Sequence, residues 1–432
     1  MSYNLEEKSK IISEKTIEKN DILSNTLVLN NTGKTISINY KINDLKNDEV
    51  EKKNTGLSFI NQNVKKQKYR NPSIDLIRLI GMYNIILDHF LFYGELYNKY
   101  PKFKKHLNFL HILIDWHNNG FALISGIIGY KTNRYSNLLY LWLVVFFYSF
   151  GIHFYIKHFK RNYVINYNIS IDCFPVIFHR YWYFTAYFGM YLFLPLINKG
   201  ISNITKNEFR LIIITTLGIF IFWKDFKNPY EDVFKMREGL SMIWLLTYYL
   251  TGAYIGKYPI YFSGIKKFIF YMICFFIYLF PSYLYIKIEN NELNFGDGFF
   301  LKKIELILKG MLRNRYDSFI KISQSLIVCL ILLPIRYNEY ITKVICFLGP
   351  LAFGIYLIHI HPLLINNFLR HIFDDHPKDI GLISLLIISY FKTLKMFIFC
   401  VIVDYLRNML FKALKIRKIC IFLEDKIYKI SC

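Results

Sequence analysis

The stretch NPSIDLIRLIGMYNIILDHFLFYG, residues Asn71–Gly94, decides the fold of this chain. As a helix it is long enough to cross the hydrocarbon core of a bilayer, which takes about 20 residues. It nevertheless carries Asp75, Arg78, Asp88 and His89. Ionisable side chains are costly in hydrocarbon, so they persist there mainly where they face other helices or water and serve a function. The stretch therefore predicts a membrane helix that carries a functional site.

Three of these side chains share one face of the predicted helix. At about 100° per residue, the eleven steps from Arg78 to His89 return to within roughly 20° of the start. Asp75 and Arg78 are three residues apart, so they can pair along the helix. Asp88 points about 100° away from His89, and we do not expect it to orient the imidazole.

The whole composition indicates a membrane protein. The chain has 432 residues, of which 54% are hydrophobic and 20% charged, and its mean hydropathy is +0.26. Apolar runs of membrane-crossing length recur along it. We predict an all-α, polytopic membrane bundle of about ten transmembrane helices. The expected spans are 74–94, 108–130, 136–157, 181–198, 209–224, 240–257, 266–286, 318–336, 343–371 and 380–410.

Three regions are expected along the chain. Residues 1–70 are polar and predict a disordered cytoplasmic tail, because such a segment buries too little apolar surface to fold. Residues 71–412 form the membrane domain, and 413–432 a short basic tail. An even number of spans puts both termini on one side, and the basic residues that flank the first and last spans favour the cytoplasm. We expect a multi-pass protein of the plasma membrane.

The chain has a net charge of +23. Its basic residues are expected to contact membrane lipids, since basic loops beside a bilayer contact anionic headgroups. No cluster of basic residues predicts a nucleic-acid partner. Seven cysteines without a CxxC pair, and the lack of a Cys/His cluster, predict neither a disulfide framework nor a metal site.

His89 is the first candidate for chemistry. An imidazole that titrates near neutrality suits a general base that removes a proton from an alcohol. The alternative is a histidine that only holds neighbouring helices together. Arg78 is planar and permanently charged, which suits a thioester, phosphate or carboxylate group. The alternative for Arg78 and Asp75 is a pair that merely neutralises itself near the membrane edge.

Other segments carry weaker signals. In GPLAFGIYLIHIHPLL, residues 349–364, His359 and His361 project about 200° apart on a helix, so we expect one in the bundle interior and the other at the interface. Pro362 should break that helix. The aromatic run Tyr181–Tyr183 is typical of an interfacial belt. Ser125 and Gly126 are typical of close helix packing.

In this order, the segments resemble acyltransferase family 3, membrane enzymes that transfer acyl groups to surface carbohydrates and related acceptors. The resemblance covers residue 70 to about residue 412. The family's first span carries an aspartate, an arginine three residues on and a histidine eleven after that, as Asp75, Arg78 and His89 do here. The further matches are Phe121–Gly126 in the second span; Trp182, Tyr183, Gly189, Tyr191, Leu192, Pro195 and Leu196 in the fourth; Ile243, Trp244, Tyr249, Leu250 and Gly252–Gly256; and Gly354–His359 with Pro362.

One motif departs from the family pattern. Many members have an RxxR pair after the second span that is associated with holding acyl-CoA, whereas this chain has Lys131 and Arg134. Lysine replaces a bidentate fork with a point charge, although a KxxR pair can still bind phosphate.

The resemblance implies an O-acyltransferase that modifies polysaccharide, with acyl-CoA, most simply acetyl-CoA, as co-substrate and no tightly bound cofactor. It implies catalytic roles for His89, Arg78 and Asp75. Substrate-binding roles are expected for Lys131, Arg134, Trp182, Tyr356 and His359.

Two alternatives stay open. A non-enzymatic exporter or carrier of a glycan or lipid-linked sugar would use the same buried charges as a binding site. A membrane-bound O-acyltransferase of the other large family would also use an intramembrane histidine. That family usually pairs the histidine with an Asn or His in a late, long span, and the first-span Asp-x-x-Arg pattern argues against it.

Overall fold

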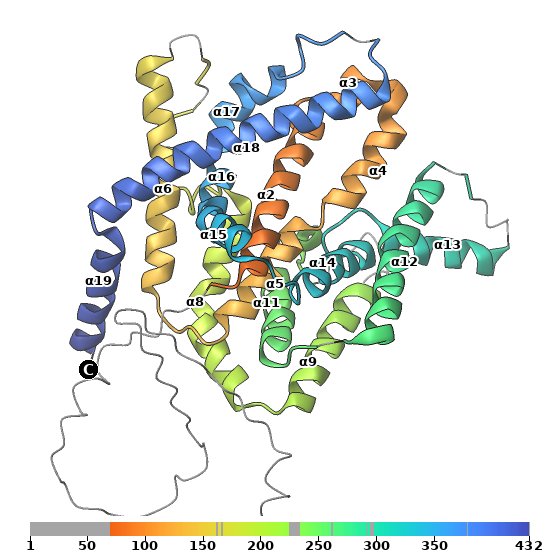
Figure 1. The fold of residues 1–432 in the computed structure, drawn as a ribbon, viewed down its shortest axis with the longest axis horizontal. Helices are drawn as coiled ribbons and strands as arrows, with labels where there is room; N and C mark the ends of the chain where they lie inside the picture. Colours follow the sequence, from red (N-terminus) through yellow and green to blue (C-terminus); the bar gives the residue numbers. More distant parts are fainter. Residues whose placement is uncertain are drawn as a thin grey trace, which may run out of the picture. The chain divides into compact units, whose positions relative to one another are not determined.

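The computed structural model describes residues 70–160, 163–165, 167–223, 234–260, 262–290, 292–293, 298–377 and 379–431. The predicted disordered tail, residues 1–70, lies outside this part of the chain except for Arg70. The regular secondary structure of the described residues is entirely helical, with no strand among them, as the sequence predicts. Figure 1 shows the helices gathered around α2. The main ones are α2 (Pro72–Tyr93), α4 (Lys104–Ile114), α5 (His117–Gly129), α6 (Ser136–Phe159), α8 (Trp182–Asn203), α9 (Lys206–Gly218), α11 (Met242–Lys257), α12 (Gly264–Glu289), α13 (Phe299–Leu312), α14 (Phe319–Leu332), α15 (Glu339–Leu348), α16 (Ala352–His359), α17 (Pro362–Asn367), α18 (Leu382–Ala413) and α19 (Ile416–Ser431).

Helix α2 begins where the sequence provides a start signal. Asn71 accepts a hydrogen bond from the main-chain N–H of Ser73, and Pro72 occupies the first helical position, where no N–H is needed. Of the five helical segments with spanning length and composition, α2 has the largest buried share. It contributes to both large hydrophobic cores, one shared with α6, α16 and α18 and the other with α5, α8 and α11. Its charged residues are therefore surrounded by protein.

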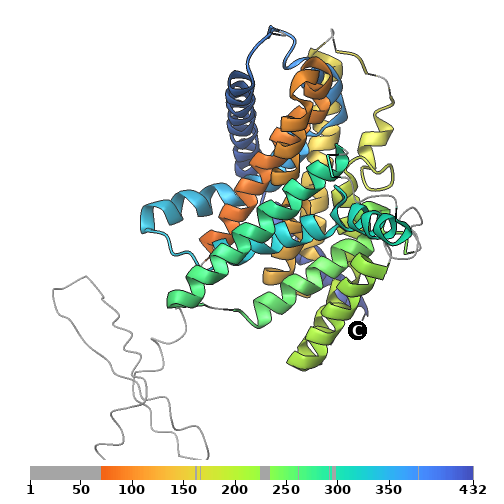
Figure 2. The same cartoon turned by 90° about the vertical axis from the view of Figure 1, so that its right-hand side faces the viewer.

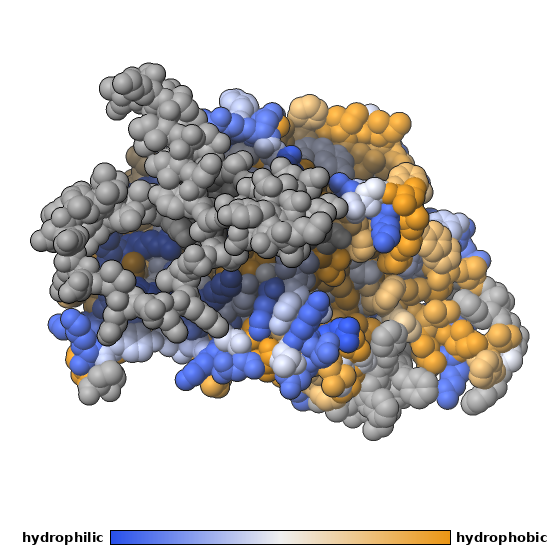
Figure 3. Space-filling model, turned by 60° about the horizontal axis from the view of Figure 1, so that its bottom comes forward, coloured by the Kyte–Doolittle hydropathy of each residue, from blue (hydrophilic) through white to orange (hydrophobic). Residues whose placement is uncertain are grey.

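Other helices present apolar side chains outward. In α12, Ile265, Phe268 and Phe275 are more than half exposed, and in α18 Ile383 and Phe391 are similarly exposed. In the space-filling view, hydrophobic side chains gather on the right-hand side, where α12 lies in Figure 1 (Figure 3). Exposed apolar surface on this scale marks contact with lipid. The chain is a membrane protein.

The predicted total of ten spans is not confirmed. Five helical segments of the described chain are long and apolar enough to cross a bilayer: α2, α6, α12, α18 and the Glu339–His359 segment. Several predicted spans are interrupted, because turns at Asp115–Trp116 separate α4 from α5 and Pro362 starts a new helix after the break at Ile360. The expected effect of Pro362 is thus confirmed. Figure 2 shows α2 and its neighbours from the side.

Small residues bring α5 and α11 into direct contact. A Cβ added to Gly126 would lie 2.0 Å from the carbonyl oxygen of Tyr249, and one on Gly252 would lie 1.9 Å from that of Leu123. Only glycine permits this approach. The packing role predicted for Gly126 is confirmed.

Two helices of more than ten residues lie where the sequence analysis expected none. Helix α13 occupies the long loop after α12, and α19 occupies the basic tail and packs against α6. In α19, Glu424 accepts a hydrogen bond from the main-chain N–H of Tyr135, 2.6 Å away.

Candidate active site

One face of α2 lines two cavities in succession. Arg78, Met82 and Ile85 line the first cavity, and His89 lines the second. Steps of four, three and four residues keep these side chains on one side of a helix. Helix α5 runs antiparallel beside α2. Gly81 faces both Phe121 and His117, whereas Asp88, further along α2, meets His117 at the start of α5. The face predicted from spacing therefore exists, with Arg78 and His89 at different cavities.

The Asp75 carboxylate lies between two guanidinium groups. Arg70 donates from Nε and Nη2 to both carboxylate oxygens, each at 2.7 Å, and Arg78 donates to Oδ1 at 2.6 Å. The predicted Asp75–Arg78 pair is confirmed, and Arg70 is an addition that the sequence analysis did not foresee. A Cβ on Gly349 would lie 2.4 Å from the Asp75 Cβ, so main chain packs directly over this carboxylate.

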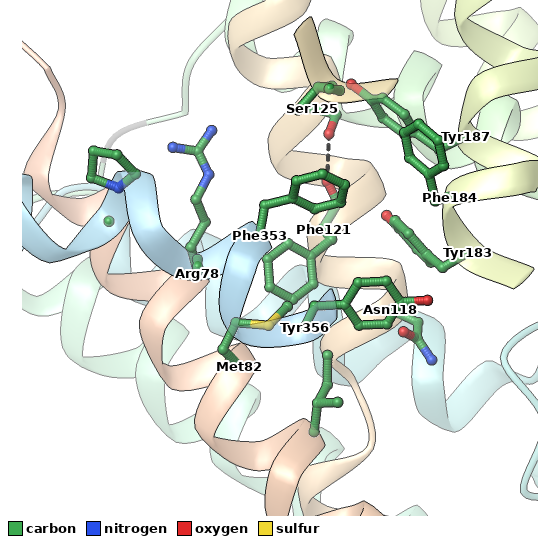
Figure 4. Close-up of a pocket in the computed structure, with 15 residues that line it drawn as sticks. Arg78, Met82, Asn118, Phe121, Ser125, Tyr183, Phe184, Tyr187, Phe353 and Tyr356 are labelled. Atoms are coloured by element: carbon green, nitrogen blue, oxygen red, sulfur yellow. Dashed lines mark hydrogen bonds between the residues drawn. The ribbon is translucent and has the colours of Figure 1, made fainter. Parts of the chain in front are cut away.

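The first cavity has a volume of about 250 Å³ and a largely aromatic wall. Figure 4 shows Arg78 at one side and Tyr183 and Asn118 at the other. Ser125, which also lines it, donates to the Phe121 carbonyl oxygen at 2.8 Å. The full lining is Arg78, Met82, Ile85, Asn118, Phe121, Ser125, Leu141, Tyr183, Phe184, Tyr187, Gly349, Pro350, Ala352, Phe353 and Tyr356.

His89 is paired with His359 of α16. Nδ1 of His89 lies 3.0 Å from Nε2 of His359, and Nδ1 of His359 lies 2.6 Å from the carbonyl oxygen of Ile355. A carbonyl oxygen only accepts, so Nδ1 of His359 carries hydrogen and its Nε2 accepts in the neutral ring. His89 must then donate from Nδ1, which leaves a lone pair on its Nε2. His359 is fully buried and lines neither of the two cavities.

The second cavity, with a volume of about 380 Å³, is more polar. Trp182 at the start of α8 stacks against Tyr316, with ring centroids 6.0 Å apart and an angle of 23° between the planes. The Tyr316 main chain is held on both sides, because its N–H donates to the Glu238 carbonyl and its own carbonyl accepts from Asn119 Nδ2 at 2.7 Å. The lining is Asp88, His89, Phe92, Tyr93, His111, Asp115, Trp182, Glu238, Leu240, Asn314, Arg315 and Tyr316.

A charged network closes one side of the second cavity. Asp88 pairs with Nδ1 of His111 at 2.5 Å, and Asp115 lies 3.3 Å from Lys321 Nζ and 3.4 Å from His117 Nε2. Donor atoms of Asp88, Asp115 and His117 lie within 4.8 Å of one another, close enough to hold a metal ion. His111 and Lys321 already offset the two carboxylates, so we assign the network to holding α2, α4, α5 and α14 together.

The two basic residues of the KxxR motif lie apart from both cavities. Lys131 and Arg134 are exposed in the loop between α5 and α6, and Lys131 lies over the Tyr130 ring. Asn198 fixes this loop by donating to the carbonyls of Gly129 and Thr132. Because α5 is antiparallel to α2, the loop lies at the Arg78 end of the site.

Two expectations about side chains in the aromatic and histidine motifs are wrong. Both His359 and His361 are fully buried, so neither lies at the interface as expected for one of them. Nδ1 of His361 accepts from the Leu363 N–H at the start of α17, and its Nε2 lies 3.2 Å from the Ser149 carbonyl oxygen. Tyr181 is buried in the core rather than in an interfacial belt, and Tyr183 lines the first cavity. Both departures arise because the helix ends at these positions are enclosed by other helices.

Comparison with known proteins identifies the family. The model of an acyltransferase domain, that of acyltransferase family 3, matches residues 71–405. The chain belongs to acyltransferase family 3. No curated protein and no solved structure matches it. The resemblance deduced from the motifs is thus confirmed, and this family member is a membrane acyltransferase.

Several residues of the site were missed from sequence. The run HILIDWH, residues 111–117, supplies His111, Asp115 and His117 to the network, and its concentration of ionisable groups inside a predicted span was a usable signal. Tyr316 and Arg315 come from a segment assigned to a loop, where no periodic pattern marks a site.

Proposed function

We propose that this acyltransferase moves an acetyl group from acetyl-CoA to a carbohydrate hydroxyl, with His89 as the general base. The observation that supports this most is the position of His89. Its unprotonated Nε2 belongs to a ring that lines a polar cavity, and the same helix face continues into an aromatic cavity that ends at an arginine. A donor and an acceptor need two binding compartments, and one face of α2 carries the base beside the second compartment and lines the first.

The first cavity suits the acyl-pantetheine arm of the donor. Its aromatic and aliphatic wall matches the apolar part of that arm. Arg70 and Arg78 share the single carboxylate of Asp75, so this cluster keeps a net positive charge at the Arg78 end of the cavity. Arg78 would bind a polar group of the donor. Lys131 and Arg134, at the same end of α2, would hold the phosphates outside the cavity.

The second cavity suits a sugar. The Trp182 and Tyr316 rings offer an aromatic surface for the C–H face of a pyranose, while carboxylate and amide side chains around them offer hydrogen-bond partners. Burial raises the pKa of the Tyr316 hydroxyl well above its usual value, so that group stays a neutral donor. Trp182 keeps the substrate-binding role predicted from sequence, whereas His359 becomes a positioning residue.

The reaction follows from these positions. His89 Nε2 takes the proton of the acceptor hydroxyl as its oxygen attacks the thioester carbonyl. A carbon–oxygen bond forms, the carbon–sulfur bond breaks, and the electron pair leaves on the CoA sulfur. The thiolate then takes the proton from the His89 imidazolium. His359 holds Nδ1 of His89 throughout, which fixes the tautomer.

The orientation proposed for the membrane follows from the donor. Acyl-CoA is a cytoplasmic metabolite, so the Arg78 end of α2 would face the cytoplasm, together with both termini, in the plasma membrane. The His89 end and the sugar cavity would face the outer side. The neighbouring partners would be membrane lipids, acyl-CoA and the carbohydrate acceptor.

Acetyl-CoA labelled in its acetyl group tests the proposal with purified protein in lipid vesicles. We expect CoA release that rises when glycan is added, with label appearing on the glycan. His89→Ala and His89→Gln should both lose about 10²- to 10⁴-fold in rate while remaining folded, because neither side chain accepts a proton at neutral pH. His106→Ala, at an exposed position, is the control.

A carrier of a glycan or lipid-linked sugar gives a different result. It would release no CoA, and His89→Gln would bind and move the glycan much as the wild type does. A purely structural His89 would tolerate Gln and misfold with Ala, which reverses the expected order.

A further inference from the structure

Two tyrosine hydroxyls at the first cavity are without hydrogen-bond partners. The hydroxyl oxygens of Tyr183 and Tyr356 are buried, and neither forms a hydrogen bond with any described residue. The Tyr356 hydroxyl lies beside the main-chain N–H of Tyr183 in the first turn of α8, in a geometry that falls short of a hydrogen bond. Both side chains line the cavity that we assign to the acyl donor. Buried hydroxyls are normally paired, so two at one cavity point to a ligand.

The two tyrosines stand next to the histidine pair. Their rings meet edge to face, with centroids 6.5 Å apart. Tyr356 in turn meets His359 edge to face at 6.4 Å, and the His359 and His89 centroids are 5.1 Å apart. The Tyr356 ring therefore lies between the Tyr183 ring and the histidine pair, whereas Arg78 is eleven residues, or about 16 Å of helix, from His89.

We infer that Tyr183 and Tyr356 form the oxyanion site of this acyltransferase. The inference rests on the proposed function and names two catalytic residues for it. When the acceptor oxygen attacks the thioester, negative charge develops on the carbonyl oxygen, and the two hydroxyls donate hydrogen bonds to it. The hydroxyls keep their protons when the carbonyl re-forms and the CoA sulfur leaves. Donors placed in advance where charge develops supply a large part of acyl-transfer catalysis.

The surroundings favour tyrosine donors over the alternative, Arg78. Arg78 already donates to Asp75 at 2.6 Å and lies toward the far end of the cavity. The Tyr183 ring is held between Trp182 and Tyr187, which lie on the same helix at centroid distances of 5.4 and 6.4 Å. Fixed rings with unpaired hydroxyls match the requirement for donors that need no rearrangement in the transition state.

Replacing each tyrosine by phenylalanine separates catalysis from stability. Tyr183→Phe and Tyr356→Phe remove one oxygen each and leave the packing intact. We expect each to lower kcat for CoA release from acetyl-CoA by about 10²-fold, with little change in KM for acetyl-CoA. The melting temperature should stay the same or rise, because an unpaired buried hydroxyl is lost. The control is Tyr337→Phe, whose hydroxyl is also buried without a hydrogen-bond partner among the described residues but lines neither cavity. It should keep full kcat.

The outcomes are distinguishable. If the wild type releases CoA and both Phe variants retain kcat within twofold, the oxyanion assignment is overturned and the proposed function stands. If a Phe variant loses both melting temperature and kcat, its hydroxyl serves the fold, and the assignment is overturned for that residue. If the wild type releases no CoA, the proposed function fails and the assignment falls with it.

Discussion

Nδ1 of His89 lies 3.0 Å from Nε2 of His359, across 270 residues of sequence. The carbonyl oxygen of Ile355 accepts from the other nitrogen of His359. The hydrogen bonds from His89 to His359 and from His359 to Ile355 therefore run in one direction, and Nε2 of His89 is left free to accept a proton. The partner of the base is thus another neutral imidazole, which adds no charge to this enclosed site.

His359 should be separable from a packing residue by its variants. His359→Ala removes the acceptor for His89 Nδ1–H, and we expect CoA release to fall about 10- to 100-fold, within the range of general-base contributions. His359→Gln keeps an oxygen that can accept the same hydrogen and should recover part of that loss. Steady-state rates and melting temperatures of the two proteins provide the measurement. Equal rates in the two variants, together with equal losses of stability, would indicate packing alone.

Loss of Asp75 should mainly reduce the stability of the protein, whereas loss of Arg78 should mainly weaken binding of the acyl donor. Asp75→Ala leaves the largely enclosed Arg78 without its counter-charge, which should cost about 3–5 kcal/mol of stability. Arg78→Met leaves Asp75 with its bidentate Arg70 partner, so it should be milder in thermal unfolding. Its KM for acetyl-CoA should nevertheless rise about 10- to 100-fold, the equivalent of one charged hydrogen bond.

The reverse pattern would contradict the assignment. An Arg78→Met protein with an unchanged KM and a large loss of stability would make the pair structural.

The contact between α5 and α11 predicts that replacing glycine by alanine will lower the stability of the protein at two positions and not at a third. Gly126→Ala and Gly252→Ala force a Cβ to within about 2 Å of a main-chain oxygen, and each should destabilise the protein by about 1–3 kcal/mol or more. Gly151→Ala in α6 meets nothing within 4 Å and should be neutral or stabilising by up to about 1 kcal/mol. Thermal unfolding in detergent compares the three. Equal melting temperatures would show that the two helices pack further apart.

Local features of the site were predictable from sequence, and long-range ones were not. Neighbouring residues determine three of these features: the helix start at Asn71 and Pro72, the apolar length of α2, and the three-residue step from Asp75 to Arg78. Each is found in the structure. The partner of His89 could not be predicted in this way, because helix periodicity indicates which face a residue occupies but not which distant helix packs against that face. The same limit hid the role of Tyr316, which a loop of the chain brings to α8.

The KxxR motif should act on the phosphates of the donor alone. Lys131→Gln combined with Arg134→Gln should raise KM for acetyl-CoA, and the difference from wild type should shrink at high salt because exposed charges are screened. Acetyl-N-acetylcysteamine has the thioester without the nucleotide, so the double variant should use it as well as the wild type does. A double variant impaired equally with both donors would place these residues in the fold instead.

Membrane orientation decides from which side each substrate enters, and two exposed asparagines report on it. Asn133 lies in the loop at the Arg78 end of α2, and Asn98 lies just beyond the His89 end. With the seven native cysteines replaced, Asn98→Cys should react with a membrane-impermeant maleimide in intact cells. Asn133→Cys should react only after permeabilisation, since we place the donor mouth in the cytoplasm. Labelling of Asn133→Cys in intact cells would put the Arg78 end outside, and acetyl-CoA could then not be the direct donor for the first cavity.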